Sequence, residues 1–128
     1  MTEVEAAVLE FVERHDWVTF ARLHKHFAGD ARASTEISLP GNRVVWLGLP
    51  KEWIDAVVGL LDQQRLAAVP SSKAAYKRDG RVLTLPLERH PADAPHDEPH
   101  WFPVFLRPMQ AVTAEQDGPA EPGEQRTP

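Results

Sequence analysis

Residues 50–69 read PKEWIDAVVGLLDQQRLAAV, and the change of periodicity within this stretch decides the fold. Apolar side chains first recur at the i, i+3, i+4 and i+7 spacing that buries one face of a helix. They are Trp53, Ile54, Val57, Val58 and Leu61. Pro50 suits the first turn of such a helix, because the N–H that proline lacks has no intrahelical partner there. From Leu66 the apolar run is short and continuous, so we predict a helix that ends near residue 65 and leads into a strand.

The strand that begins at Leu66 is expected to be the outgoing arm of a β-hairpin. This arm continues to Tyr76, with an interruption at residues 70–72. The pair Asp79-Gly80 is the turn signal, because a type I′ turn needs a positive φ at both central residues. Residues 81–87 then alternate between two faces, as a returning strand does. We therefore predict a two-stranded hairpin directly after the helix.

Two further helices are predicted on the N-terminal side. Thr2 and Glu5 have the spacing of a capping box, which predicts a first helix that ends near residues 15–16. After a short extended pair, Thr19 can cap a second helix that runs through Phe27.

The connection between the second and third helices is long. It covers residues 28–49, and its first part is rich in residues typical of loops and turns. Residues 44–47 are an apolar run that favours a buried strand. We expect an extended insertion here, long enough for an added strand or hairpin.

Charge and proline content change near residue 90. Residues 1–90 hold 12 basic and 12 acidic side chains, whereas residues 91–128 hold 2 basic and 7 acidic ones and eight of the twelve prolines. The net charge of -5 therefore belongs to the C-terminal part. We predict a domain at residues 1–90, an extended arm at residues 91–112 and an acidic, proline-rich tail without fixed structure at residues 113–128.

The arm contains an apolar island, residues 101–106, that is too hydrophobic for a simple linker. Its aromatic members are Trp101, Phe102 and Phe105. Two interpretations remain open for these side chains. They dock back on the domain and complete its core, or they bind a protein partner or a second copy of the chain.

Several classes of protein are not expected. The chain has no cysteine and therefore no disulfide, and no apolar run approaches the length of a membrane span. The acidic N-terminus is unlike a signal peptide, so we expect a cytoplasmic protein.

Catalytic and metal-site signatures are also missing. The sequence holds no glycine-rich phosphate loop, no nucleophile elbow and no His-Glu zinc motif. His24 and His26 would point to different sides of a helix, and His96 and His100 lack companion ligands. We expect no enzyme, no catalytic residue, no cofactor, no metal and no small-molecule substrate.

The order of predicted elements resembles that of the winged-helix superfamily: helix, short strand, helix, extended segment, helix and hairpin. The stretches that carry the likeness, over residues 2–88, are WVTFARL at residues 17–23, LLDQQRL at residues 60–66 and YKRDGRVL at residues 76–83. The resemblance implies an α+β fold with three helices and a C-terminal two-stranded β-hairpin wing. The long insertion between helices 2 and 3 departs from the usual short turn.

In winged-helix DNA binders the third helix usually enters the major groove and the wing contacts phosphate. Here the outer face of the third helix is expected to carry acids, which phosphates repel. The residues expected on it are Glu52, Asp55, Gly59, Asp62 and Gln63. The predicted wing is basic instead, since residues 65–90 hold 6 basic and 2 acidic side chains. The candidate DNA contacts are Lys73, Lys77, Arg78 and Arg81 on the wing, with Arg22, Lys25 and His26 on the second helix.

Two functions follow from these features. The first is a DNA-binding transcriptional regulator, acting as a dimer, that contacts the backbone of double-stranded DNA through its basic wing. The second is a winged-helix module that binds another protein through the acidic third helix or the apolar arm, because this fold also serves protein interaction. The arrangement of the cations in space discriminates between the two.

Overall fold

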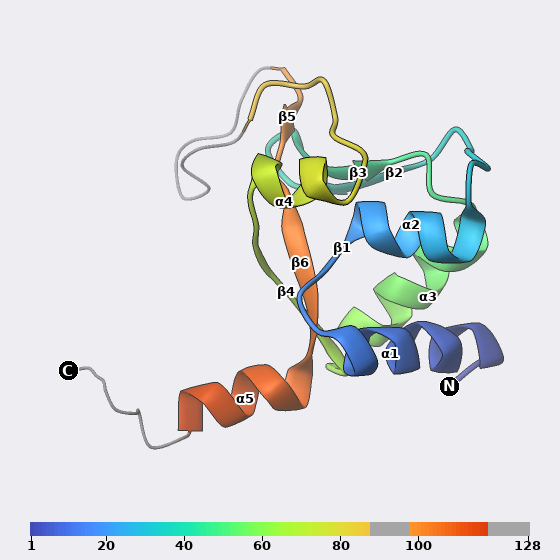
Figure 1. Ribbon diagram of the computed structural model, residues 1–128, viewed down its shortest axis with the longest axis vertical. Coiled ribbons are helices and arrows are strands. Elements are labelled where there is room, and N and C mark those ends of the chain that lie inside the picture. The colour runs from blue at the N-terminus through green and yellow to red at the C-terminus, as the bar shows by residue number, and fades with distance from the viewer. Residues whose placement is uncertain (88–97, 118–128) are drawn as a thin grey trace.

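The computed structural model describes residues 1–87 and 98–117 (Figure 1). The predicted α+β class is confirmed, and the described residues form five helices and two three-stranded sheets. Three of the helices, α1 (Glu3–His15), α2 (Phe20–Ala28) and α3 (Lys51–Asp62), lie where the sequence predicts them.

Local capping explains where the first two helices begin. Thr2 accepts a hydrogen bond from the Glu5 N–H (3.0 Å) and its own N–H donates to the Glu5 carboxylate (2.9 Å), so the predicted capping box is present. Thr19 accepts from the Arg22 N–H at the start of α2. Each cap satisfies a backbone N–H that has no partner within the helix.

Four of the five residues in the predicted apolar stripe of α3 face the core, and Val58 does not. Val57 is buried, and the other three, Trp53, Ile54 and Leu61, pack against the core. Val58 is 39% exposed, although its spacing places it among the core residues. Gly59, expected on the outer face, packs against the Glu5 carboxylate of α1 so closely that a Cβ would collide with it. The absence of a side chain at Gly59 leaves room for this carboxylate, which also accepts a hydrogen bond from the Gln63 side chain (3.2 Å).

The first sheet is built around a strand from the C-terminal part of the chain. Its order is β1 (Val18–Thr19), β6 (Val104–Pro108) and β4 (Leu66–Pro70), with both pairs antiparallel. Leu106 of β6 is fully buried and pairs with both Val18 and Ala68. The core therefore includes residues on both sides of the division expected at residue 90.

The second sheet contains the long insertion. Its order is β2 (Glu36–Leu39), β3 (Arg43–Leu47) and β5 (His100–Trp101). β2 and β3 form an antiparallel hairpin whose turn has positive φ at Gly41 and Asn42, and β5 runs parallel to β3. The predicted strand at residues 44–47 is confirmed as part of β3.

The hairpin predicted at residues 66–87 is wrong. Lys73–Arg78 form the helix α4, which Ser72 caps by accepting from the Ala75 N–H (3.1 Å). Residues 81–87 do not form a strand of either sheet. They make a single isolated β-bridge, between Leu87 and Trp101. Strand β4 pairs with β6 instead. Gly80, with φ +102, follows a helix and does not join two strands. A glycine with positive φ occurs both in hairpin turns and at helix ends, so the Asp79-Gly80 pair does not distinguish the two.

The C-terminal helix α5 (Met109–Asp117) continues directly from β6 and points away from the body of the fold (Figure 1). The lack of structure predicted from residue 113 is therefore wrong for residues 113–117, which are helical. The rest of the predicted tail, residues 118–128, and the linker at residues 88–97 lie outside the described residues.

Candidate nucleic-acid interface

The start of α2 and the end of α4 are joined by polar contacts, some of them buried. The Thr19 hydroxyl donates to the Asp79 carboxylate (2.7 Å), and the Phe20 N–H donates to the Tyr76 hydroxyl (3.0 Å). The Tyr76 hydroxyl in turn donates to the Val104 carbonyl of β6 (2.6 Å). The start of α2 is thus fixed against the end of α4 (Figure 1).

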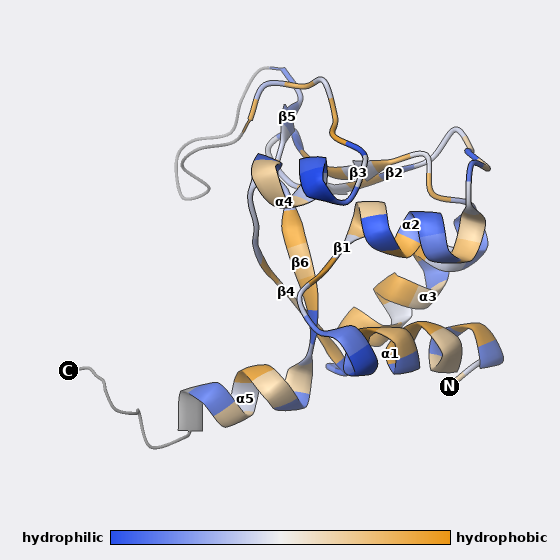
Figure 2. Cartoon of the chain, viewed as in Figure 1, coloured by the Kyte–Doolittle hydropathy of each residue, from blue (hydrophilic) through white to orange (hydrophobic). Residues whose placement is uncertain are grey.

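This junction brings most of the predicted cations onto neighbouring helices. The exposed cations of the two helices, named here the α2–α4 basic surface, are Arg22, Lys25, Lys73, Lys77 and Arg78. Figure 2 shows hydrophilic residues at the end of α4 beside those of α2. Arg78 lies 3.7 Å from Asp79 but its side chain remains 70% exposed, so it stays accessible to an anion in solution.

Two of the predicted α2 contacts have packing roles as well. His26 stacks on the Phe11 ring of α1, with the centroids 4.3 Å apart. The Arg22 guanidinium lies 3.0 Å from His15 Nδ1 and 5.8 Å from the centre of the Phe11 ring. Arg22 is still exposed, so these contacts orient the side chain without removing it from solvent.

Arg81 does not lie at a hairpin tip, which corrects the prediction that groups it with the other wing cations. Its guanidinium covers the Trp46 ring at 4.5 Å and donates to the Leu47 carbonyl (3.0 Å). Burial lowers the pKa of Arg81, and the neighbouring Arg32 lowers it further. The side chain turns inward because Trp46 offers an aromatic face on which the flat guanidinium stacks well.

His24 completes the inner layer beneath Arg81. Its Nε2 lies 2.7 Å from the Ala31 carbonyl, so this nitrogen carries the proton, and Nδ1 accepts from the Trp46 indole N–H (3.2 Å). Burial lowers the pKa of His24, and the charges of Arg81 and Arg32 act in the same direction. Both effects favour the neutral form of His24, the form in which Nδ1 accepts the hydrogen bond from Trp46.

The third helix keeps an acidic exposed surface. Glu52, Asp55 and Asp62 are exposed on α3. Lys51 lies 2.7 Å from Asp55, so the positive charge at the start of the helix already has a carboxylate partner. Phosphates would meet net negative charge here.

The aromatic side chains of the apolar island, which the sequence leaves open between docking on the domain and binding a partner, lie largely within the fold. Trp101 is buried and packs edge-on against Tyr76, with centroids 5.1 Å apart. Phe102 and Phe105 are half-buried, and Phe105 meets the Trp17 ring edge-on at 5.5 Å. Trp101 is thus a core residue that a partner cannot reach in this conformation.

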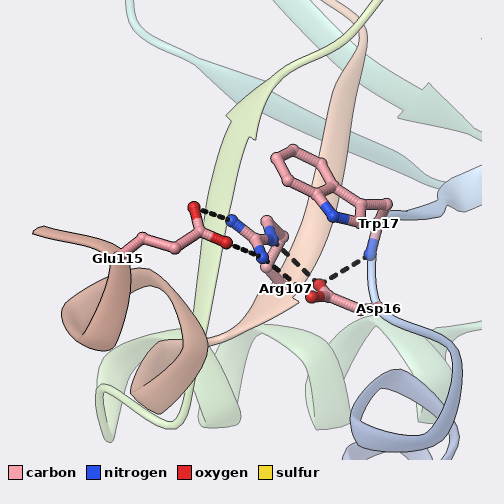
Figure 3. Close-up of polar contacts among 4 residues, drawn as sticks. All are labelled: Asp16, Trp17, Arg107 and Glu115. Carbon is pink, nitrogen blue, oxygen red and sulfur yellow. Dashed lines mark hydrogen bonds and ion pairs between the residues drawn. The ribbon is translucent and has the colours of Figure 1, made fainter. Parts of the chain in front are cut away.

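An ion cluster at the end of β6 is absent from the sequence predictions (Figure 3). Arg107 is buried, donates to Asp16 at 2.9 and 2.8 Å and to Glu115 at 2.9 and 2.6 Å, and lies 3.6 Å from the Trp17 ring centre. Hydrogen bonds from Arg107 hold the pKa of Asp16 below its usual value. The cluster ties the α1–β1 turn and α5 to β6. The partners are 91 and 8 residues away, and no local signal reveals such a pairing.

Nothing in the described part of the chain resembles a metal centre, since residues 1–87 and 98–117 bring together no three His, Asp or Glu side chains suited to a metal ion. Over the same ranges, no helix is both long enough and apolar enough to cross a bilayer. Models of known protein families, curated proteins and solved structures were all compared with this chain, and none matches it.

Proposed function

We propose that this protein binds double-stranded DNA through phosphate contacts of the α2–α4 basic surface and acts as a transcriptional regulator of the winged-helix type. The order α1, β1, α2, α3, β4, β6 and the antiparallel sheet β1-β6-β4 support this proposal. In this interpretation β4 and β6 are the wing strands, and the segment that carries α4 and β5 is inserted between them.

The observation that carries the proposal is the junction of α2 and α4. Two exposed cations lie on α2 and three on α4, and the two groups are more than forty positions apart in the sequence. The contacts of Thr19 and Tyr76 fix these two helices to each other. The Asp79 carboxylate, which is part of this junction, accepts from the Thr19 hydroxyl at 2.7 Å and lies 3.7 Å from Arg78. Cations held in this way favour contact with the DNA backbone, which positions a protein without reading sequence.

The test is binding of labelled duplex DNA at about 50 and 200 mM salt, because affinity that depends on phosphate contacts falls steeply as salt rises between these concentrations. The variant is Lys77→Ala/Arg78→Ala. The matched control is Lys51→Ala/Arg65→Ala, which removes the same charge from exposed positions on and after α3. We expect the first variant to weaken binding and to flatten the salt dependence by about 0.9 per lost contact. The control should bind like the unmodified protein.

Equal loss in both variants would mean that net charge alone drives the interaction, and the proposed surface would be wrong. Absence of binding at low salt would favour the second function, a protein-interaction module. The observation in favour of that alternative is Val58, a large apolar side chain 39% exposed on the helix that carries Glu52, Asp55 and Asp62. An acidic helix with an apolar centre suits a basic groove on a partner protein.

A further inference from the structure

A cavity of about 190 Å³ lies between α2 and the turn that follows α4. Three cations line it: Lys25 from α2, Arg32 from the loop after α2, and Arg81 from the segment after α4. Only Lys25 also belongs to the α2–α4 basic surface. The cavity is therefore a feature separate from the cations of α4.

Arg81 has unused hydrogen-bonding capacity at this cavity. A guanidinium has five N–H donors, and the acceptors near Arg81 are the Leu47 carbonyl and, at a long 3.4 Å, His24 Nδ1. That nitrogen already accepts from Trp46. Among residues 1–87 and 98–117, no carboxylate forms an ion pair with Arg81 or Arg32. Arg81 is half-buried, and the positive charge of Arg32 lowers the pKa of Arg81.

Two acids also line the cavity, Asp30 and Asp79. The Asp79 carboxylate is engaged by the Thr19 hydroxyl at 2.7 Å and by Arg78 at 3.7 Å. Asp30 is exposed. The lining therefore carries three positive and two negative charges, and the Asp79 carboxylate already has two partners outside the set of cavity cations.

We propose that this cavity binds a phosphate group, with Arg81 and Arg32 as hydrogen-bond donors and Lys25 as the third positive charge. Arginine suits this ligand because its planar fork matches the geometry of phosphate oxygens. The stacking of Arg81 on Trp46 fixes the orientation of the fork before the ligand arrives, which reduces the ordering needed on binding. The site does not depend on the proposed contacts of α4 with DNA.

The first experiment titrates the ¹⁵N-labelled protein with inorganic phosphate at about pH 7.5, a unit above the ordinary pKa of histidine. Chloride at the same ionic strength is the reference. The reporter is the Trp46 indole N–H signal, because this group touches both His24 and Arg81. We expect a saturable shift of this signal with phosphate only, while the Trp17 indole signal stays in place.

Variants then test the assignment of residues. Arg32 is exposed, so Arg32→Ala should fold normally and weaken phosphate binding about threefold to fivefold, the upper part of the range for exposed charge pairs. Asp30→Asn should tighten binding, because it removes a repulsive charge. The matched control Lys51→Ala should change nothing. A shift that is linear, or equal with chloride, or unchanged in Arg32→Ala would overturn the proposal.

The source of the phosphate is decided with short duplexes that carry or lack a 5′-phosphate. A Trp46 shift caused only by the phosphorylated duplex identifies a terminal phosphate monoester, and equal shifts identify the internal phosphodiester. Both results support the site. If the Trp46 signal does not shift with either duplex or with inorganic phosphate, the proposal is refuted. The Lys77→Ala/Arg78→Ala variant separates the two proposals, since it should keep the inorganic phosphate shift. Loss of duplex binding by that variant bears on the α2–α4 basic surface alone.

Discussion

The Tyr76 hydroxyl makes two hydrogen bonds to elements that are distant in the sequence. The substitution Tyr76→Phe tests how much these two bonds contribute to the free energy of unfolding. Tyr76 is fully buried, and its hydroxyl joins three elements by accepting from the Phe20 N–H of α2 and donating to the Val104 carbonyl of β6. Phenylalanine fills nearly the same volume, so the change removes two hydrogen bonds and leaves the packing in place.

The cost follows from the two groups left behind. The Phe20 N–H belongs to the first turn of α2, where no intrahelical acceptor exists, and the Thr19 side chain already serves Arg22. A buried polar group without a partner costs about 1–3 kcal/mol. Two such groups lead us to expect a loss of about 3 kcal/mol in the free energy of unfolding. This is a large part of the roughly 5–15 kcal/mol typical of a domain.

The assay is equilibrium unfolding in urea, followed by the fluorescence of the four tryptophans. The midpoint should fall while the slope stays constant, because the surface exposed on unfolding is unchanged. A loss below about 0.5 kcal/mol would refute the reasoning, since it would mean that neither group is left unsatisfied in a dry environment.

The pH dependence provides an independent check on the same side chain. Burial raises the pKa of Tyr76 above its ordinary value of 10.0. The unfolded chain therefore releases this proton at a lower pH than the folded protein does. Stability should be unaffected below about pH 10 and should fall as the pH rises above it. Tyr76→Phe should lack this alkaline loss, and an identical alkaline profile in both proteins would contradict the assignment.

Three further predictions concern other contacts. Because the pKa of His24 is lowered in the folded protein, the unfolded chain binds a proton at this side chain at a higher pH than the folded protein does. The free energy of unfolding should therefore decrease as the pH is lowered through about 6.5, and His24→Gln should show a smaller decrease in urea unfolding. Gly59→Ala should add little to the free energy of unfolding, although helix propensity alone would add roughly 1 kcal/mol, because the new methyl group displaces the Glu5 carboxylate. In a Glu5→Ala background the same substitution should give the full gain. Additive effects of the two changes would contradict this explanation. Arg107→Met should cost about 2 kcal/mol, less than at a fully buried pair, because the Asp16 and Glu115 side chains are 27% and 60% exposed; thermal unfolding that stays unchanged would show that the cluster adds no stability.

The parts of the fold that sequence predicts well are those with local causes. Thr2, Thr19 and the apolar spacing of residues 50–61 each act within one or two helical turns, and the three helices they predict are present. The pairing of β4 is different, because its partner β6 lies more than thirty residues away. An Asp-Gly pair after an apolar segment is compatible with a hairpin turn and with the end of a helix. The choice between them depends on Tyr76, whose two hydrogen-bond partners belong to distant elements.

The candidate site also has a part that the sequence predicts and a part that depends on contacts between distant residues. Composition reveals the cations of residues 65–90, but their directions depend on tertiary contacts. Arg81 turns inward because Trp46, from the inserted hairpin, lies beneath it. Arg32 joins it because the loop after α2 folds back, where the Ala31 carbonyl meets His24. The cations near α4 therefore form two features: the exposed set on α2 and α4, which suits a long polyanion, and the set that lines the cavity, which suits a single phosphate. Lys25 borders both, so Lys25→Ala should weaken duplex binding and phosphate binding together. Arg32→Ala should weaken the binding of inorganic phosphate, whereas Lys77→Ala/Arg78→Ala should weaken duplex binding and leave the inorganic phosphate shift in place.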